Sequence, residues 1–403
     1  MGKSIFSFAT LVVAASFSLT SCTATQPLGQ TPESSDTSVT LPSVKLSDPN
    51  LFSELKSCRI QDGDPELTNM TAGFPIPKGR IDLRSGANVH IIGVDFADKS
   101  GGTVSPQEQN QIFTDDIQSF YEAQSSVPLR FEWNWYPEWV TMPKSINKYG
   151  LGGSFFSGKF NGNAYFDFAR KIIDIVDEEI DFSGSNFLFI VFPKGVTNEE
   201  IGTFVVHTDD VYVTDEETIP NLIMAGGYYV ASDTYIHEFG HGLGLTDIRD
   251  TRDVGNQKSD GMYYDVMGST DHFELLVWNR FLLGFLEDTQ LHCKTSQETS
   301  THWLIPVASE SKQVKGVVVP INDTEAIIVE SRRPIGYDTS LIGAPDLIGA
   351  VVYTLDSKIP YKRSPVKVVD VLMVGESVEV MGYTFRVIES GDFGDVVEIA
   401  KIQ

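Results

Sequence analysis

The stretch YIHEFGHGLGLTD, residues 235 to 247, carries the residue types that bind a transition metal and activate water. His237 and His241 are four positions apart, so on a helix both imidazoles project from one face and can bind one ion. Glu238 falls beside that face, where a carboxylate can accept a proton from water without ligating the metal. The spacing therefore predicts a helix with two zinc ligands and Glu238 as the general base.

Two residues that follow this helix can complete the site. Gly244 is able to adopt the positive φ that ends a helix and turns the chain back towards the histidine face. Asp247 would then bring a carboxylate to the same ion and leave the fourth position of a tetrahedral site for water. We therefore expect His237, His241 and Asp247 to form the metal site.

Three segments together resemble a known family of enzymes. HEFGHGLGLTD is similar to the extended signature of the metzincin metallopeptidases, and YYDVMGS supplies Met267 for the methionine turn that those enzymes carry beneath the metal. With WNRFLLGFL (278–286), these segments most resemble the immune inhibitor A family of secreted bacterial metallopeptidases. The resemblance covers about residues 88–290 and is specific at 235–290. It implies a zinc endopeptidase with Asp247 as third ligand and Met267 in the turn.

Rival ligands lie close to the signature. His272, Glu274 and Asp265 could each donate an atom to the metal, but Asp247 has the spacing of the signature and is preferred. The longer members of the family have a large propeptide and several C-terminal domains, for which this chain has little room, so zymogen control is not implied. The other histidines are expected to be structural or exposed: His90, His207, His292 and His302.

The predicted reaction is the hydrolysis of peptide bonds in a protein or peptide substrate. A water activated by the metal would attack the carbonyl, while Glu238 takes its proton and delivers it to the leaving amine. Tyr264, or its neighbour Tyr263, could donate a hydrogen bond to the developing oxyanion, although packing is the commoner role of such a tyrosine. The alternative is a cell-surface binding protein with a structural metal site and a β domain that binds a polymer.

Composition excludes other classes of function. The 403 residues include 55 acidic and 30 basic side chains, and the net charge of -25 would repel nucleic acid. We find no Gly-x-Ser-x-Gly elbow and no phosphate-binding glycine-rich loop. The acidic segment 207–218 is either a solvated edge, which we favour, or a calcium site. We expect a monomer.

The first 22 residues read as a secretory signal, with one lysine, an apolar run and small residues. Leu19 to Cys22 resembles the lipobox of bacterial lipoproteins, so we expect a lipid on Cys22 and a cell-surface protein; simple secretory cleavage is the alternative. Cys58 and Cys293 then remain as a pair in an oxidising compartment, which favours a disulfide. The other possibility is that Cys58 is a latency ligand of the metal.

The elements that position these residues follow from hydrophobic periodicity. Apolar runs predict strands at 88–98 and 187–193, and helical spacing predicts helices at 107–124, with Ile112 among its apolar residues, and at 164–180. The aromatic segment 129–140 predicts a strand pair. Its residues Trp133, Trp135 and Trp139 could form a sugar platform, but we expect them to pack.

Short apolar runs after residue 301 predict about seven strands and few helices. The predicted fold class is therefore α+β: an α/β-like, metzincin-like catalytic core with an active-site helix, followed by an all-β, sandwich-like C-terminal domain. The expected boundaries are a signal peptide at 1–22, a disordered tether at 23–50, an N-terminal extension at 51–87, the catalytic domain at 88–298 and the β domain at 299–403.

Overall fold

The structure is a computed structural model. It describes residues 42–403 except 64–68, 153–161, 198–199, 202–203, 225–231, 251–260, 262, 270–272 and 361–362, and it leaves out the side chains of 162, 204–211, 223–224 and 232. The signal peptide, Cys22 and most of the expected tether lie outside the described residues. Within the described ranges, no helix is long and apolar enough to cross a membrane.

The first sheet has six strands and is mostly parallel. Its members are β1 (Ala87–Phe96), β2 (Phe131–Trp135), β3 (Val140–Met142), β4 (Phe187–Val191), β5 (Phe204–Val213) and β6 (Thr218–Met224). Their order is β2-β1-β4-β6-β5, with β3 also paired to β1, and only β5 runs antiparallel to its neighbour. Both faces of β1 and β4 are buried, which explains their near-continuous apolar sequences.

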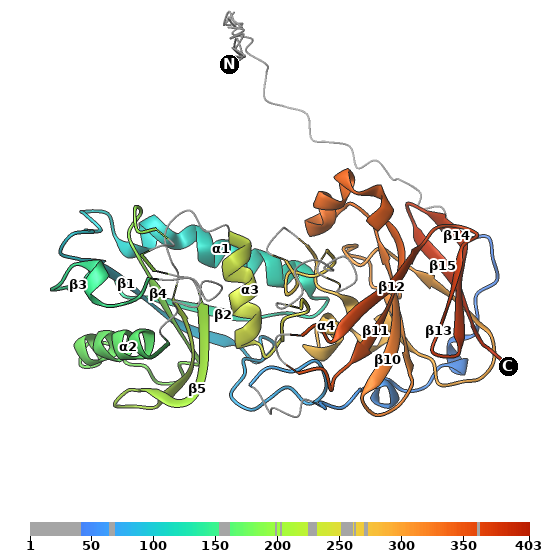
Figure 1. Ribbon diagram of the computed structural model, residues 1–403, viewed down its shortest axis with the longest axis horizontal. Coiled ribbons are helices and arrows are strands. Elements are labelled where there is room, and N and C mark those ends of the chain that lie inside the picture. Colours follow the sequence, from blue (N-terminus) through green and yellow to red (C-terminus); the bar gives the residue numbers. More distant parts are fainter. Residues whose placement is uncertain are drawn as a thin grey trace, which may run out of the picture. The chain divides into compact units, whose positions relative to one another are not determined.

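Helices cover this sheet on both faces (Figure 1). On one face, α1 (Pro106–Gln124) and α3 (Ser232–Gly242) pack on Val89, Ile91 and the odd-numbered residues of β4. On the other face, α2 (Gly162–Val176) packs on Ile92, Val94 and the even-numbered residues of β4. The sheet therefore separates two apolar cores.

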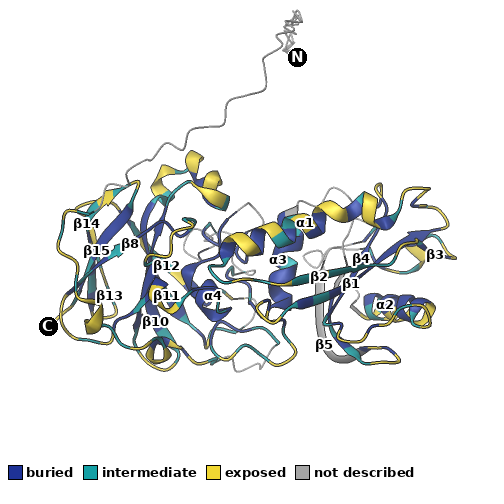
Figure 2. Cartoon of the chain, turned by 180° about the vertical axis from the view of Figure 1, so that it is seen from behind, coloured by how far each residue is buried: buried dark blue, intermediate teal, exposed yellow. Residues whose placement is uncertain are grey.

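Two expectations for the helices were wrong. Ile112, expected on the apolar stripe of the first helix, is 56% exposed, and its neighbour Phe113 is buried instead. The second helix ends at Val176 rather than at residue 180, and Ile175 near its end is 49% exposed. Figure 2 shows exposed residues along the outer sides of both helices. Both helices contain adjacent apolar residues, such as Ile112 and Phe113 or Ile175 and Val176. The sequence pattern alone does not show which residue of such a pair faces the core.

The remaining strands form two antiparallel-rich sheets. One has the order β12-β11-β10-β9-β7 and the other β13-β14-β15-β8. Apolar side chains from both sheets form a common core, as the predicted sandwich requires. The bounds are β7 (Leu291–Cys293), β8 (Ser300–Leu304), β9 (Gly316–Pro320), β10 (Glu325–Arg332), β11 (Gly349–Asp356), β12 (Val366–Leu372), β13 (Ser377–Val380), β14 (Tyr383–Gly391) and β15 (Gly394–Lys401).

The five-stranded sheet is also part of the core around α3. Its inner residues Val318, Ile328 and Tyr353 belong to the same apolar cluster as Met267 and Phe239. The short helix α4 (Val277–Leu282) lies in this region and is buried at every position (Figure 2). The structure therefore has the mixed α+β class that the sequence predicts. Residues Thr40–Gln403 form one compact unit.

A disulfide joins Cys58 to Cys293 across 235 residues of sequence. Cys58 ends the 3-10 segment Leu55–Cys58, and Cys293 ends β7, where it also forms a bridge to Ser53. Because the Cys58 thiol is used in this bond, the structure contains the first of the two predicted alternatives and not a latency ligand.

Candidate metal centre

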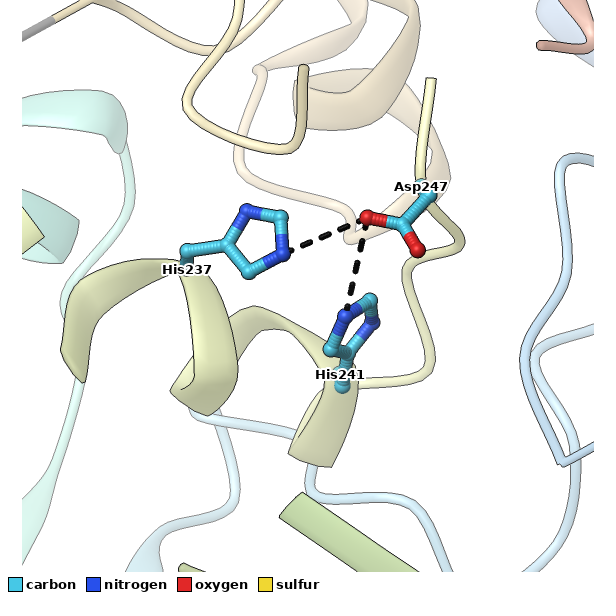
Figure 3. A group of neighbouring side chains, drawn as sticks. All are labelled: His237, His241 and Asp247. Atoms are coloured by element: carbon cyan, nitrogen blue, oxygen red, sulfur yellow. Dashed lines mark ion pairs between the residues drawn. The ribbon is translucent and has the colours of Figure 1, made fainter. Parts of the chain in front are cut away.

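Three buried side chains converge beside α3 (Figure 3). The Nε2 atom of His237 lies 3.3 Å from Oδ1 of Asp247, and Nε2 of His241 lies 3.9 Å from the same oxygen. Ligand atoms of the three residues all lie within 4.8 Å of one another. Their exposed fractions are 2%, 7% and 5%, respectively. The three residues predicted as metal ligands are therefore brought together.

The turn that brings Asp247 back is a Schellman motif. Leu245 N donates to the carbonyl of Gly240 at 3.1 Å, and Gly244 N donates to that of His241 at 2.9 Å. Gly244 has a φ of 96°, and a Cβ there would lie 3.0 Å from the side chains of Ile76 and Arg80. Both the conformation and the close packing require glycine at this position.

Hydrogen bonds at the far side of each ring fix the tautomer of both histidines. His237 Nδ1 lies 2.8 Å from the carbonyl of Val266, and His241 Nδ1 lies 2.8 Å from that of Leu245. A carbonyl oxygen can only accept, so Nδ1 carries the proton in each neutral ring. The Nε2 lone pairs then face Asp247, the arrangement that metal-binding histidines require.

The charges of the three groups favour a cation between them. Burial opposes protonation of His237, but contact with Asp247 outweighs it and raises the pKa of the ring. Burial lowers the pKa of His241 to about 4, and the two histidines hold the pKa of Asp247 well below its usual value despite burial. Asp247 Oδ1 is buried and accepts no well-aligned hydrogen bond from any described residue. The two nitrogen lone pairs and the carboxylate oxygen repel one another unless a cation or a proton lies between them, so this group could hold a metal ion.

Met267 lies directly beneath α3. A Cβ added at Gly240 would be 2.5 Å from Met267 Sδ and 2.9 Å from the hydroxyl of Tyr121, so this helix position must be small for the turn to approach. Met267 itself is fully buried. The preceding residue Val266 provides the carbonyl bonded to His237, so the turn contacts α3 and one of the site histidines directly.

Asp265 organises this turn, a role that our sequence reasoning missed. Its carboxylate accepts hydrogen bonds from Met267 N and Leu276 N, each at 2.7 Å, and from Asn279 Nδ2 at 2.8 Å. Burial raises its pKa to about 6, although these bonds partly oppose the shift. The position of this acid immediately before VMGS was the only signal in the sequence for such a role.

Buried charges link the same turn to the five-stranded sheet. Arg332, at the end of β10, donates to the carbonyl of Tyr264 and forms ion pairs with Glu330 at 2.7 Å and Asp338 at 2.8 Å. Glu330 also accepts from Val277 N, the first residue of α4, at 2.8 Å. Polar residues inside the apolar strand EAIIVESR were the sequence signal for this network.

The rival ligands and the candidate tyrosine have other surroundings. Asp265 accepts hydrogen bonds from the turn, and Glu274 forms an ion pair with Arg280. Neither residue belongs to the converging group. His272 lies outside the described residues. Tyr264 is 1% exposed and its ring lies against Arg332, with 5.7 Å between guanidinium carbon and ring centre. Its predicted role towards an oxyanion stays a prediction. Glu238 is half-buried on α3 next to His237.

None of the other predicted binding residues that the structure describes joins the converging group. His90, His292 and His302 are not members of the converging group, and the side chains of His207 and of the predicted calcium segment up to residue 211 lie outside the described part. Trp133 and Trp135 pack against the core that contains α1 and α3. Trp133 donates to Gln118 at 3.0 Å, and Trp139 to the carbonyl of Val104 at 2.7 Å, as expected for packed rings.

Comparisons of this chain with protein-family models, with curated proteins and with solved structures found no match.

Proposed function

We propose that this chain is an exported, zinc-dependent endopeptidase with a metzincin-like catalytic core. The observation that carries the proposal is the convergence of His237, His241 and Asp247 within 4.8 Å, with Glu238 on the same helix. The fixed Nδ1 protons and the buried carboxylate oxygen support the same conclusion. The Schellman turn after α3 and the contact of Met267 with Gly240 support the comparison with metzincins.

The residues divide the chemistry between them. His237, His241 and Asp247 would hold the ion, which when bound supplies Lewis acidity that polarises a carbonyl and makes water more acidic. Glu238 lies beside the ligand face of α3, because it follows His237 directly in the helix. From there its carboxylate can take a proton from water during attack on the peptide carbonyl and give it to the leaving nitrogen.

Export is part of the proposal. The apolar N-terminal segment and the sequence LTSC ending at Cys22 favour a secreted or lipid-anchored protein. The disulfide between Cys58 and Cys293 supports an oxidising compartment. A protein anchored through Cys22 would be found in the membrane fraction, and the Cys22→Ala variant would not.

Replacing Glu238 with alanine tests the proposed reaction. We expect the variant to bind zinc as the wild type does, because Glu238 is not one of the ligands, and to hydrolyse a casein-like protein roughly a thousandfold more slowly. The matched control is Glu108→Ala, which removes an exposed carboxylate from α1. Zinc content by atomic absorption and hydrolysis by release of new amino termini are measured on the same samples.

Two results would contradict the proposal. Equal turnover by wild type and Glu238→Ala would exclude Glu238 as the base. A wild-type protein that retains zinc through dialysis, cleaves no member of a peptide library and binds a hydroxamate poorly would favour a surface binding protein with a structural metal.

A further inference from the structure

A hollow lies at the edge of the first sheet, on the face that α2 covers. Its volume is about 500 Å³, which is large enough for a small organic group. His90 of β1 and Asn134 of β2 are paired across the strands and form its floor. Its walls come from the chain after β2 and from the turn after α2. The polar lining residues used below are His90, Asn134, Tyr136, Glu138, Glu179 and Asp181.

His90 is a buried base at this floor. The side chain is only 8% exposed, and its Nδ1 makes no hydrogen bond to any described residue. Its ring packs edge-on against Phe182 at 4.9 Å. Burial lowers the pKa of His90, against the opposing charges of Glu132, Asp181, Glu216 and Glu217, so the ring is neutral at pH 7. His90 lines the hollow, so its neutral ring adds no positive charge that would repel a bound cation.

The walls are acidic. Glu138, Glu179 and Asp181 are all exposed, and the residues that line the hollow include no lysine or arginine. Tyr136 donates its hydroxyl hydrogen to Glu179, which leaves its ring as the aromatic side of the hollow. Carboxylates, an aromatic ring and a neutral base are together the groups that bind an organic cation.

Other ligand classes fit less well. Among the described residues, only His237, His241 and Asp247 form a group of three ligating side chains with atoms within 4.8 Å of one another, so the acids of the hollow do not make up such a metal-binding group. The negative walls repel anions.

We propose that this hollow binds an ammonium or guanidinium group, either a free amine or the side chain of a lysine or arginine. The first sheet lies between the hollow and the metal centre, because α2 and α3 pack on opposite faces of it (Figure 1). Binding is therefore independent of peptide hydrolysis and persists in the Glu238→Ala variant. If the protein proved to have no peptidase activity, the proposal that this hollow binds a cation would still stand.

A pair of matched ligands tests the site on the full chain. N-acetyl-arginine amide carries one guanidinium, and N-acetyl-citrulline amide has almost the same shape without the charge. We expect the arginine compound to bind roughly tenfold more tightly by calorimetry, and this difference to shrink as salt is raised. It should also shift the Cε1–H resonance of His90, which the His90→Gln variant identifies. Equal affinities for the two compounds would overturn the proposal.

Variants of exposed residues provide the second measurement. The double variant Glu179→Gln, Asp181→Asn should bind the arginine compound roughly tenfold more weakly, because two wall charges are lost. The control Asp174→Asn removes an exposed carboxylate from α2 that does not line the hollow, and should change affinity less than twofold. Unchanged binding by the double variant would exclude the site.

A third comparison identifies the source of the cation. Tighter binding of an arginine-containing peptide than of agmatine would support a polypeptide ligand. The reverse order would support a free amine, and in both cases the charged group binds in the hollow. A peptide and an amine that both leave the His90 resonance unmoved would contradict it.

Discussion

At the scale of single residues, the proposed metal site depends on two backbone carbonyls as well as on its three candidate ligands. The carbonyls of Val266 and Leu245 hold the Nδ1 protons of the two histidines and so direct both Nε2 lone pairs at Asp247. Asp247 adds the negative charge that a divalent ion needs in a buried site.

Asp247→Ala should therefore lower zinc affinity at least roughly a hundredfold, because one ligand and one compensating charge are lost together. Competition with a chromogenic chelator measures the change. Asp250→Ala is the matched control, since it removes a carboxylate three residues later that does not belong to the converging group. An affinity equal to that of the wild type would mean that another residue, such as His272, completes the site.

A second pair of histidines predicts how stability depends on pH. His292 and His302 face each other through their Nδ1 atoms at 2.9 Å, Phe52 stacks on both, and His302 Nε2 contacts Ser300 Oγ at 2.8 Å. Burial lowers the pKa of His292 to about 4 and that of His302 well below 6.5. The unfolded chain, whose histidines titrate near pH 6.5, thus binds more protons in this range than the folded protein.

The contribution of this pair to the free energy of unfolding is fully present above about pH 6.5 and is lost as the pH falls towards 4. The loss amounts to at most about 1.4 kcal/mol per pH unit for each histidine. His302→Gln keeps a polar group beside Ser300 but cannot be protonated. Urea unfolding should give a shallower decline for this variant between pH 6.5 and 4, and parallel curves for both proteins above pH 7. Identical slopes throughout would show that the pair is not protonated on unfolding.

At the scale of elements, sequence periodicity predicted much of the first sheet and its helices. The strand expected at 88–98 is β1 and the helix expected at 107–124 is α1, because long amphipathic or apolar runs leave few alternatives. The choice between Ile112 and Phe113 could not be made, since adjacent apolar residues fit two helix faces equally well. Arg332, Glu330 and Asp338 could not be assigned either, because charged residues are usually exposed and only tertiary packing pairs them inside.

The contact between α3 and the Met267 turn gives a test at this scale. Gly240→Ala would put a Cβ 2.5 Å from Met267 Sδ and 2.9 Å from the Tyr121 hydroxyl, which itself donates to the carbonyl of Ile236. We expect the free energy of unfolding to fall by about 1–3 kcal/mol, because overpacking exceeds the gain from alanine in a helix. Gly343→Ala meets no atom within 4 Å and serves as the control. Urea unfolding that ranks the two variants equally would contradict this close contact.

At the scale of the whole molecule, the two predicted halves are not independent. β7 precedes the predicted boundary at 299 yet belongs to the five-stranded sheet, and one apolar cluster extends from α3 to β11. The sequence could not indicate this, because apolar residues on both faces of a strand identify a buried strand but not its neighbours. The disulfide from Cys58 to β7 adds a covalent link across the same region.

Removing that disulfide tests how strongly it stabilises the compact unit. In the entropic model, a closed loop of this length contributes about 5.5 kcal/mol, so the double variant Cys58→Ala, Cys293→Ala should unfold at a clearly lower urea concentration. Reductant should destabilise the wild type and leave the double variant unchanged. If both proteins unfold at the same urea concentration, the bond contributes little beyond the packing around it.

The contact between Arg332 and the carbonyl of Tyr264 also bears on the order of events during synthesis. A chain emerges from the ribosome starting at its N-terminus, so α3 is complete long before β10 exists. The turn that orients His237 receives its final support only after residue 332 has been made and β10 has joined its sheet. The proposed metal site would therefore be completed only after most of the polypeptide has been made, because one of its supporting contacts comes from Arg332.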